Sequence, residues 1–382
     1  MEKETKEVVQ SALDSLKEII KFWITSFQGF GKELRERKIT KDYKSLIDSA
    51  SLANPLEELE KLFKLIHAHS TKLGILFKPV IDNNKKNVIL EELKETNKVL
   101  ILLTSACAQV QTETIKNNSF SFVFSSELNQ YVLSLYEIYS RFVDELGESL
   151  DVTEFEDGDT DNRLICVGQI WESCDSLAKL IKGGQSGVLK RKIKETTSLI
   201  TDACEELEEW TENPDVEGID DPFKFNDDDD DDDEESEDEG SKIPTKASDD
   251  DGKDQDGDQI DEELKKVVEY GKKWVYKIKL IKLLLSSLDK SIPSEKASKD
   301  KKHQNEYAKA MDSLDKSRMK LSEYTDDVVC TIIEDNDTSM ADEFGDKLKK
   351  ETDGIIKKVR ILNTNDEKKT KWLDNWSVKF KE

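Results

Sequence analysis

The sequence predicts an all-α protein, an extended multi-helix bundle arranged as two antiparallel helical bundles with a disordered acidic insert. Three observations support this fold class. Apolar residues recur every three or four positions over most of the chain, which places them on one face of a helix. No segment shows the alternation of apolar and polar residues that is typical of a half-buried strand. The links between the periodic segments are short, which favours antiparallel neighbours.

Four periodic segments fill the first 150 residues. Their apolar stripes are Val9, Leu13, Leu16, Ile20, Trp23, Phe27 and Phe30; Leu59, Leu62, Ile66, Leu73 and Leu76; Ile89, Leu93, Thr96, Leu100, Leu103, Cys107 and Val110; and Leu128, Tyr131, Leu135, Ile138 and Phe142. The second helix has well-marked ends, because Asn54 is a good N-cap, Pro55 suits the first helical position and Pro79 cannot continue a helix. Wide apolar faces favour a bundle over a dimeric coiled coil.

Six more helices are expected after the polar segment that ends near residue 161. Two of them are expected to form a hairpin around a loop at Gly183, Gly184 and Gly187. The stripes and ranges are Leu164, Val167, Trp171, Cys174, Ala178 and Ile181; Leu189, Ile193, Thr196, Ile200, Ala203, Leu207 and Trp210; Val267, Trp274, Ile278, Ile281, Leu285 and Leu288; and residues 303–333, 341–362 and 368–380.

The net charge of −26 is concentrated in one segment. Residues 215–263 hold 25 of the 84 acidic side chains and only four lysines, which leaves a net charge of −5 for the rest. Too few apolar residues lie there to offset the entropy lost on ordering. The sequence therefore predicts disorder over 214–259, and domains at 1–150 and at 161–213 plus 260–382. Because a chain with this much negative charge repels the phosphate backbone, direct nucleic-acid binding is not expected.

The chain is expected to act in the cytoplasm and the nucleus. Its first ten residues are mostly polar or charged, so no secretory leader is expected. The uncharged stretch 99–112 is fourteen residues long, shorter than the roughly 18 that a membrane span requires. No CxxC pair occurs, and the five cysteines are expected to be reduced core thiols. They are Cys107, Cys166, Cys174, Cys204 and Cys330.

No pattern indicates an enzyme, a cofactor or a specific metal site. His67 and His69 are two positions apart on a helix and point about 200° apart, so they do not bind one ion together. Residues 252–263 resemble a calcium loop only in part, because Gly252 stands at the first ligand position. No serine, cysteine or histidine set matches a known nucleophile motif.

Three further features allow more than one interpretation. The basic, amphipathic segment 272–282 is typical of an ordinary bundle helix, but it also suits anionic lipid or the acidic insert. Ser236 and Ser248 are each followed by three acids, which suits an acid-directed kinase. Aromatic side chains at helical spacing are core residues more often than exposed anchors, and this applies to Trp23, Trp372 and Trp376.

Two strings resemble the signature of the cyclin-D-interacting, GCIP-like family. The first covers residues 54–79 and contains Ile-His-Ala-His-Ser-Thr-Lys-Leu-Gly; the second is Val-Gly-Gln-Ile-Trp-Glu-Ser-Cys at 167–174. The residues that match are Pro55, Leu59, His67, His69, Thr71, Lys72, Gly74, Phe77, Pro79, Gly168, Trp171 and Cys174. The helix over 197–210 and the acidic tract after it also fit the layout of the family.

The resemblance implies a non-enzymatic, all-helical protein that binds D-type cyclins and signalling adaptors. Animal members are described as inhibitory, helix-loop-helix-like factors that act on cell-cycle progression and transcription. The long aspartate run and lysine-rich composition indicate a divergent, fungal-type member, whose partners are cyclin-like or helix-loop-helix-type factors. The alternative is an acidic chaperone or buffer that binds basic proteins such as histones through residues 214–259.

Overall fold

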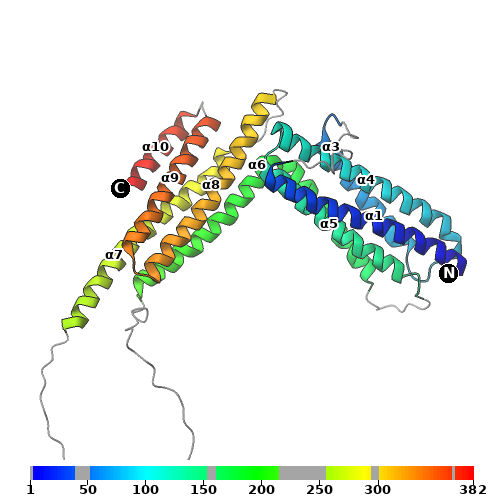
Figure 1. Cartoon of the computed structure of the whole chain (residues 1–382), viewed down its shortest axis with the longest axis horizontal. Helices are drawn as coiled ribbons and strands as arrows, with labels where there is room; N and C mark the ends of the chain where they lie inside the picture. The colour runs from blue at the N-terminus through cyan, green and yellow to red at the C-terminus, as the bar shows by residue number, and fades with distance from the viewer. Residues whose placement is uncertain (1–2, 39–51, 153–160, 215–254, 294–300, 364–365) are drawn as a thin grey trace, which may run out of the picture. The chain divides into compact units, whose positions relative to one another are not determined.

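The computed structural model describes residues 3–38, 52–152, 161–214, 255–293, 301–363 and 366–382, with only the backbone of 255–261. Within these ranges the chain forms helices and no strand, so the all-α prediction is confirmed (Figure 1). The elements are α1 (Lys3–Glu36), α3 (Pro55–Leu76), the 3-10 helix η2 (Asn83–Lys85), α4 (Lys86–Asn117), α5 (Phe122–Glu148), α6 (Asn162–Glu212), α7 (Gln255–Ser291), α8 (Lys301–Ile333), α9 (Thr338–Leu362) and α10 (Glu367–Lys381).

Most of the acidic tract, including Ser236 and Ser248, lies outside the described residues. The structure differs from the prediction at the end of this tract, because α7 begins at Gln255, inside the range 214–259. The partial calcium-loop pattern is therefore helical from that residue onward. In the part of the chain that the structure describes, no helix has the length and apolar content needed to cross a membrane.

The helices form two compact units. The first comprises Met1–Glu195, Ser287–Arg318 and Lys357–Lys369, and the second comprises Thr196–Ser286, Met319–Ile356 and Thr370–Glu382. These units differ from the predicted domains, because α6, α7, α8, α9 and α10 each contribute residues to both. The predicted domain limits state which segments fold independently. The two compact units do not test independent folding, so the limits stay a prediction.

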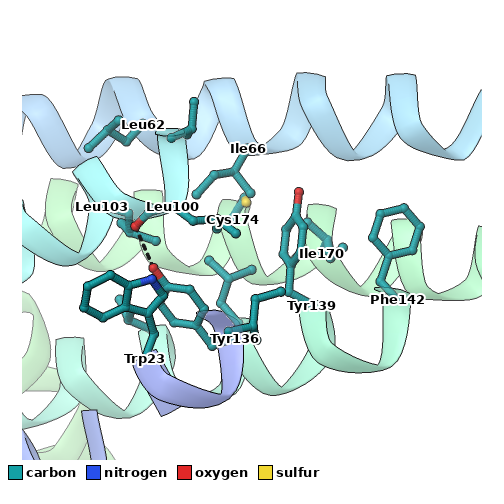
Figure 2. Packing of buried hydrophobic residues seen from close by; sticks show 14 of the residues in the cluster. Trp23, Leu62, Ile66, Leu100, Leu103, Tyr136, Tyr139, Phe142, Ile170 and Cys174 are labelled. Carbon is teal, nitrogen blue, oxygen red and sulfur yellow. Dashed lines mark hydrogen bonds between the residues drawn. The ribbon is translucent and has the colours of Figure 1, made fainter. Parts of the chain in front are cut away.

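In the first unit, α1 packs against α4 and α5, and α3 packs against α4. Every residue of the stripes predicted for α1 and α4 is buried. Figure 2 shows part of this core, where Tyr136 and Tyr139 of α5 lie among the aliphatic side chains. The Tyr136 hydroxyl donates to the Leu100 carbonyl oxygen at 2.7 Å and lies 2.8 Å from the Thr104 hydroxyl. A polar atom deep in the core is thus satisfied locally.

The ends of α3 are set by the residues that the sequence indicates. The Asn54 side chain accepts a hydrogen bond from the Glu57 N–H at 3.4 Å, and Pro55 occupies the first helical turn. At the other end, the Phe77 N–H donates to the Leu73 carbonyl oxygen at 3.0 Å. Both predicted ends of this helix are confirmed, which fixes where its side chains point.

The break predicted between two helices at Gly183, Gly184 and Gly187 is confirmed, but it is a kink at one residue and not a loop of several residues. Residues 162–212, labelled α6, are two helices that meet at Gly184 (φ 60°, ψ −162°). That backbone conformation is open essentially to glycine alone. Gln185, directly after the kink, is buried and accepts a hydrogen bond from the Ser121 N–H at 2.6 Å. A single glycine conformation therefore redirects the helix where the sequence suggests a loop.

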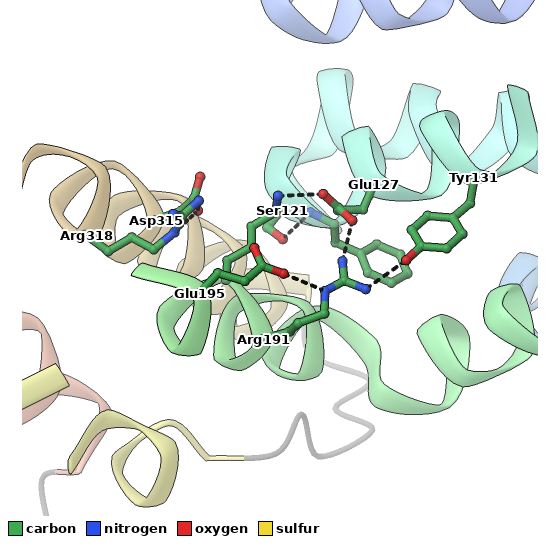
Figure 3. Close-up of polar contacts among 9 residues, drawn as sticks. Ser121, Glu127, Tyr131, Arg191, Glu195, Asp315 and Arg318 are labelled. Atoms are coloured by element: carbon green, nitrogen blue, oxygen red, sulfur yellow. Dashed lines mark hydrogen bonds and ion pairs between the residues drawn. The ribbon is translucent and has the colours of Figure 1, made fainter. Parts of the chain in front are cut away.

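A polar cluster holds α6 against α5 beyond the kink (Figure 3). The buried carboxylate of Glu127 is paired with Arg191 and with Lys192, whose Nζ lies 2.5 Å from Oε1. Arg191 also donates to the Tyr131 hydroxyl at 3.0 Å and lies 3.7 Å from Glu195. Two cations thus offset the desolvation of one buried carboxylate.

The second unit has its own aromatic core. All residues of the stripe predicted for α7 are buried, and segment 272–282 is a bundle helix with exposed lysines. Trp274 lies against Gly345 of α9, where an added Cβ would stand 2.5 Å from the indole ring. Trp376 of α10 donates to the Leu280 carbonyl oxygen at 2.8 Å. Trp376 is therefore a core residue, as is Trp23 in the first unit, whereas Trp372 is half-buried.

The cysteine prediction is correct for four of the five thiols. Cys107, Cys166, Cys174 and Cys204 are buried, but Cys330 on α8 is exposed. All five are free thiols. Buried residues of the neighbouring turns, Thr325, Val328 and Ile332, lie on the opposite side of α8 from Cys330.

Candidate protein-interaction site

The two strings that carry the family resemblance meet in the structure. Trp171 contacts His67 and Thr71, and Val167 contacts Gly74. Because a later residue of α3 meets an earlier residue of α6, the two helices are antiparallel. A Cβ atom on Gly74 would lie 3.0 Å from Cγ2 of Val167, so the glycine allows this close approach.

Trp171 is exposed, yet its indole is held on two sides. The ring stacks on the His67 imidazole, with centroids 4.7 Å apart and an interplanar angle of 13°. Its Nε1–H donates to the Thr71 hydroxyl at 3.1 Å, and that hydroxyl donates to the His67 carbonyl oxygen at 2.7 Å. The side chain is 38% exposed, so its predicted place in the buried stripe is wrong. A fixed, exposed tryptophan is a typical anchor for a protein partner.

His69 and Lys72 converge on Glu92, which extends from α4. Nδ1 of His69 lies 2.5 Å from one carboxylate oxygen of Glu92, and Nζ of Lys72 lies 3.6 Å from the other. Glu92 is only 9% exposed, and its two partners compensate its burial. The contacts of His69 and Lys72 with Glu92 hold the turn of α3 that contains Thr71 against α4. His67 and His69 therefore have different partners, as their spacing predicts.

The other motif residues have structural positions. Leu59 and Phe77 are fully buried, and Pro55 begins α3, whereas Pro79 follows its end. Cys174 lies in the core, where burial raises the pKa of its thiol to about 12. The thiol is therefore protonated at neutral pH, and a protonated thiol is a poor nucleophile.

Exposed apolar side chains surround Trp171. Ile75 of α3 is 66% exposed and Leu164 of α6 is 53% exposed. Between Leu164 and Trp171 in the helix lies Gly168, where an added Cβ would meet no atom within 4 Å. We call the surface formed by His67, Thr71, Ile75, Leu164, Gly168 and Trp171 the α3–α6 face. Within the described residues, it combines an aromatic anchor with exposed apolar neighbours.

Sequence reasoning missed three contributors, which are Ile75, Leu164 and Glu92. Glu92 lies at the edge of an apolar stripe, next to Leu93, and a charge in that position is the signal for a buried partner. The sequence pattern places Leu164 in the buried stripe of α6. The structure leaves Leu164 exposed and buries Ile170 and Leu177, which the predicted stripe does not include. Ser236 and Ser248 lie outside the described residues, so their phosphorylation stays a prediction.

The fold and this face define an all-helical protein with an exposed anchor on a rigid helix pair. Residues 58–213, which include most of α3 and all of α6, match the family model described as Grap2 and cyclin-D-interacting, N-terminal. This match confirms the resemblance to the GCIP-like family. No solved structure matches the chain significantly.

Two fungal proteins are similar over most of the chain. An uncharacterized protein of Saccharomyces cerevisiae is 29% identical over 337 residues, which are 86% of this chain and 86% of that protein. An uncharacterized protein of Schizosaccharomyces pombe is 25% identical over 353 residues, or 90% of each chain. These relatives agree with the prediction of a divergent, fungal-type member.

Proposed function

We propose that the chain is a non-enzymatic protein-interaction protein that binds its partner through the α3–α6 face. The observation that carries the proposal is the exposed indole of Trp171, fixed by His67 and Thr71. An anchor that is already ordered loses little conformational entropy on binding, so more of its contact energy contributes to affinity. The name of the matching family, cyclin-D-interacting, supports a protein as the ligand.

The finer part of the proposal concerns the partner and the place of action. The partner is a cyclin-like or helix-loop-helix-type factor, and the chain acts in the cytoplasm and the nucleus on cell-cycle progression or transcription. This part rests on the family resemblance. The second candidate, an acidic buffer for basic proteins, rests on the 25 acidic side chains of residues 215–263.

Affinity capture from cells distinguishes these candidates. The baits are the full chain, a Trp171→Ala variant, a variant that lacks residues 214–259, and a Tyr276→Ala control. Tyr276 is an exposed aromatic residue of α7 that does not belong to the α3–α6 face. Each bait is washed at low and at high salt, because contacts made by an acidic tract are screened by salt.

We expect specific partners to survive the deletion, high salt and Tyr276→Ala, and to be lost with Trp171→Ala. If all partners are lost with the tract or with salt, the acidic-buffer function is supported and the proposal is wrong. Partners that bind equally well to the Trp171→Ala variant would place the interaction elsewhere on the protein.

A further inference from the structure

We infer that the ligand of the α3–α6 face is an amphipathic helix with one acidic and one basic flank. This inference rests on the proposed function and adds the kind of partner segment. It starts from the spacing of the exposed positions on α6. Leu164, Gly168 and Trp171 follow at intervals of four and three, so they form one ridge that spans about two helical turns, or about 10 Å.

The centre of this ridge is open. Gly168 has no side chain, and an added Cβ there would meet no atom within 4 Å. Leu164 and Trp171 stand on either side of it along the helix. A helical partner with apolar residues at i, i+4 and i+7 has the same two-turn repeat, so its middle residue fits above Gly168. The rigid indole and Leu164 then contact the outer two residues.

The two sides of the face carry opposite charges. Lys72 of α3 and Lys78, two residues after the end of α3, are exposed on either side of Ile75, and Lys72 also lies 3.6 Å from Glu92. On α6, Glu172 is exposed on the side of the ridge away from α3, and Asp175 is exposed where the ridge continues beyond Trp171. A complementary helix that lies on this ridge therefore has acidic residues on the flank that faces α3. It has basic residues on the opposite flank, which faces Glu172. Because reversing a helix exchanges its two flanks, these charges also select the direction in which the partner lies.

Synthetic helical peptides of about 16 residues test the inference with the full chain. Each has leucines at i, i+4 and i+7 and a fluorescent label, and the flanks are acidic and basic, both acidic, or both basic. Affinity is measured by fluorescence anisotropy at physiological salt. The peptide with opposite flanks is expected to bind at least fivefold more tightly than the other two.

Three variants locate the peptide. Gly168→Leu fills the open space, and Trp171→Ala removes the anchor; each is expected to weaken binding by about tenfold or more. Gly183→Leu is the matched control, because Gly183 is also an exposed glycine of α6 with no atom near an added Cβ. It is expected to change the affinity less than twofold. Since both glycine positions are open, both leucine variants should fold.

Equal binding of all three peptides would overturn the charge assignment. Undiminished binding to Gly168→Leu, or no binding of any peptide, would overturn the helical ligand on this face. Cellular partners that are lost with Trp171→Ala while the peptides fail would leave the proposed function standing. The two ideas can therefore fail separately.

Discussion

Trp171 differs from the other tryptophans in how its indole is satisfied. Trp23, Trp210, Trp274 and Trp376 are buried, whereas Trp171 is exposed and held by His67 and Thr71. Placing a large ring in solvent leaves apolar area unburied, and an indole fixed by stacking and a hydrogen bond also loses rotamer freedom. An indole that is both exposed and fixed in one rotamer is best explained by a role in binding a protein partner.

Gly345 is a test of packing at a single residue. The Gly345→Ala change would place a Cβ 2.5 Å from one atom of the Trp274 ring and 2.7 Å from another. Overpacking of this kind costs about 1–3 kcal/mol, which exceeds the helix propensity gained from alanine of about 1 kcal/mol. We expect a lower free energy of unfolding in urea. Combining the change with Trp274→Phe should recover part of the loss, and additive effects would contradict the proposed clash.

Asp312 provides a test of pH dependence. One of its carboxylate oxygens accepts the Val123 N–H of α5 at 3.1 Å, and burial raises its pKa. An acid with a raised folded-state pKa stabilises the fold fully below the unfolded pKa of about 3.9, and this stabilisation is lost as pH rises through the folded pKa. Asp312→Asn keeps an acceptor and does not titrate, so it should be more stable than the natural protein at pH 7.5.

Urea unfolding at several pH values checks this expectation. The advantage of Asp312→Asn should shrink as the pH falls through the folded pKa. Asp312→Ala removes the acceptor for the Val123 N–H and should be less stable than Asp312→Asn at every pH. A constant difference between Asp312→Asn and the natural protein would show that the titration of this carboxyl does not contribute.

Among the elements, α6 shows how one backbone conformation can replace a loop. Its two halves are separate helices, as the glycine cluster predicts, but one residue joins them where a longer turn was expected. In the structure only Gly184 leaves the helical region, and Gln185 then hydrogen-bonds to the start of α5. The helix on either side of the kink is held by its own contacts, through Trp171 before it and Arg191 after it.

The kink predicts different effects for two adjacent glycines. Gly184→Ala forces a side chain into a conformation with φ of 60° and ψ of −162°, and should cost about 1–3 kcal/mol. Gly183→Ala lies in helical backbone with open space around it, and should be neutral or stabilising by up to about 1 kcal/mol. Thermal and urea unfolding of the two variants would measure the contrast. Equal effects would mean that the kink adjusts without strain.

For the whole molecule, the core of the first unit extends beyond the predicted domain limit at residue 150. Ile170, Cys174, Leu177 and Val188 of α6 belong to the same buried cluster as the stripes of α1 and α4. Asp312 and Asn305 of α8, which belong to the same unit, also form hydrogen bonds with Val123 of α5 and Asn117 of α4. The first unit is therefore assembled from segments that are far apart in the sequence.

A fragment comparison tests this organisation. We expect a fragment of residues 1–150 to lack a cooperative unfolding transition, because it would expose the surface that α6 covers. The full chain should unfold cooperatively, and adding residues 151–195 to the fragment should restore part of the cooperativity. Circular dichroism during urea unfolding is the measurement. Full cooperativity of the 1–150 fragment would instead support the predicted domain limit.

The sequence alone determined the helices, both ends of α3 and most of the buried stripes. In α1 and α4 the apolar residues spaced three and four positions apart form one stripe, and every residue of that stripe is buried, although other apolar residues such as Phe22 and Leu102 are exposed. Asn54 and Pro55 identify the start of α3 by their own chemistry. The two strings that form the candidate site were also recognisable, because they resemble the signature of the GCIP-like family, whose model matches residues 58–213.

Only the tertiary structure decided which side of α6 is buried and what its motif residues contact. Apolar residues there include Leu164, Val167, Ile170, Trp171 and Leu177, and they cover more than one face of the helix. Periodicity gives the direction of each side chain but not what covers it. The approach of α3 at Gly74 and of α5 around Tyr139 buries one arc and leaves Leu164 and Trp171 exposed. Exposure on a wide apolar helix is thus a property of its neighbours, which the local sequence does not contain.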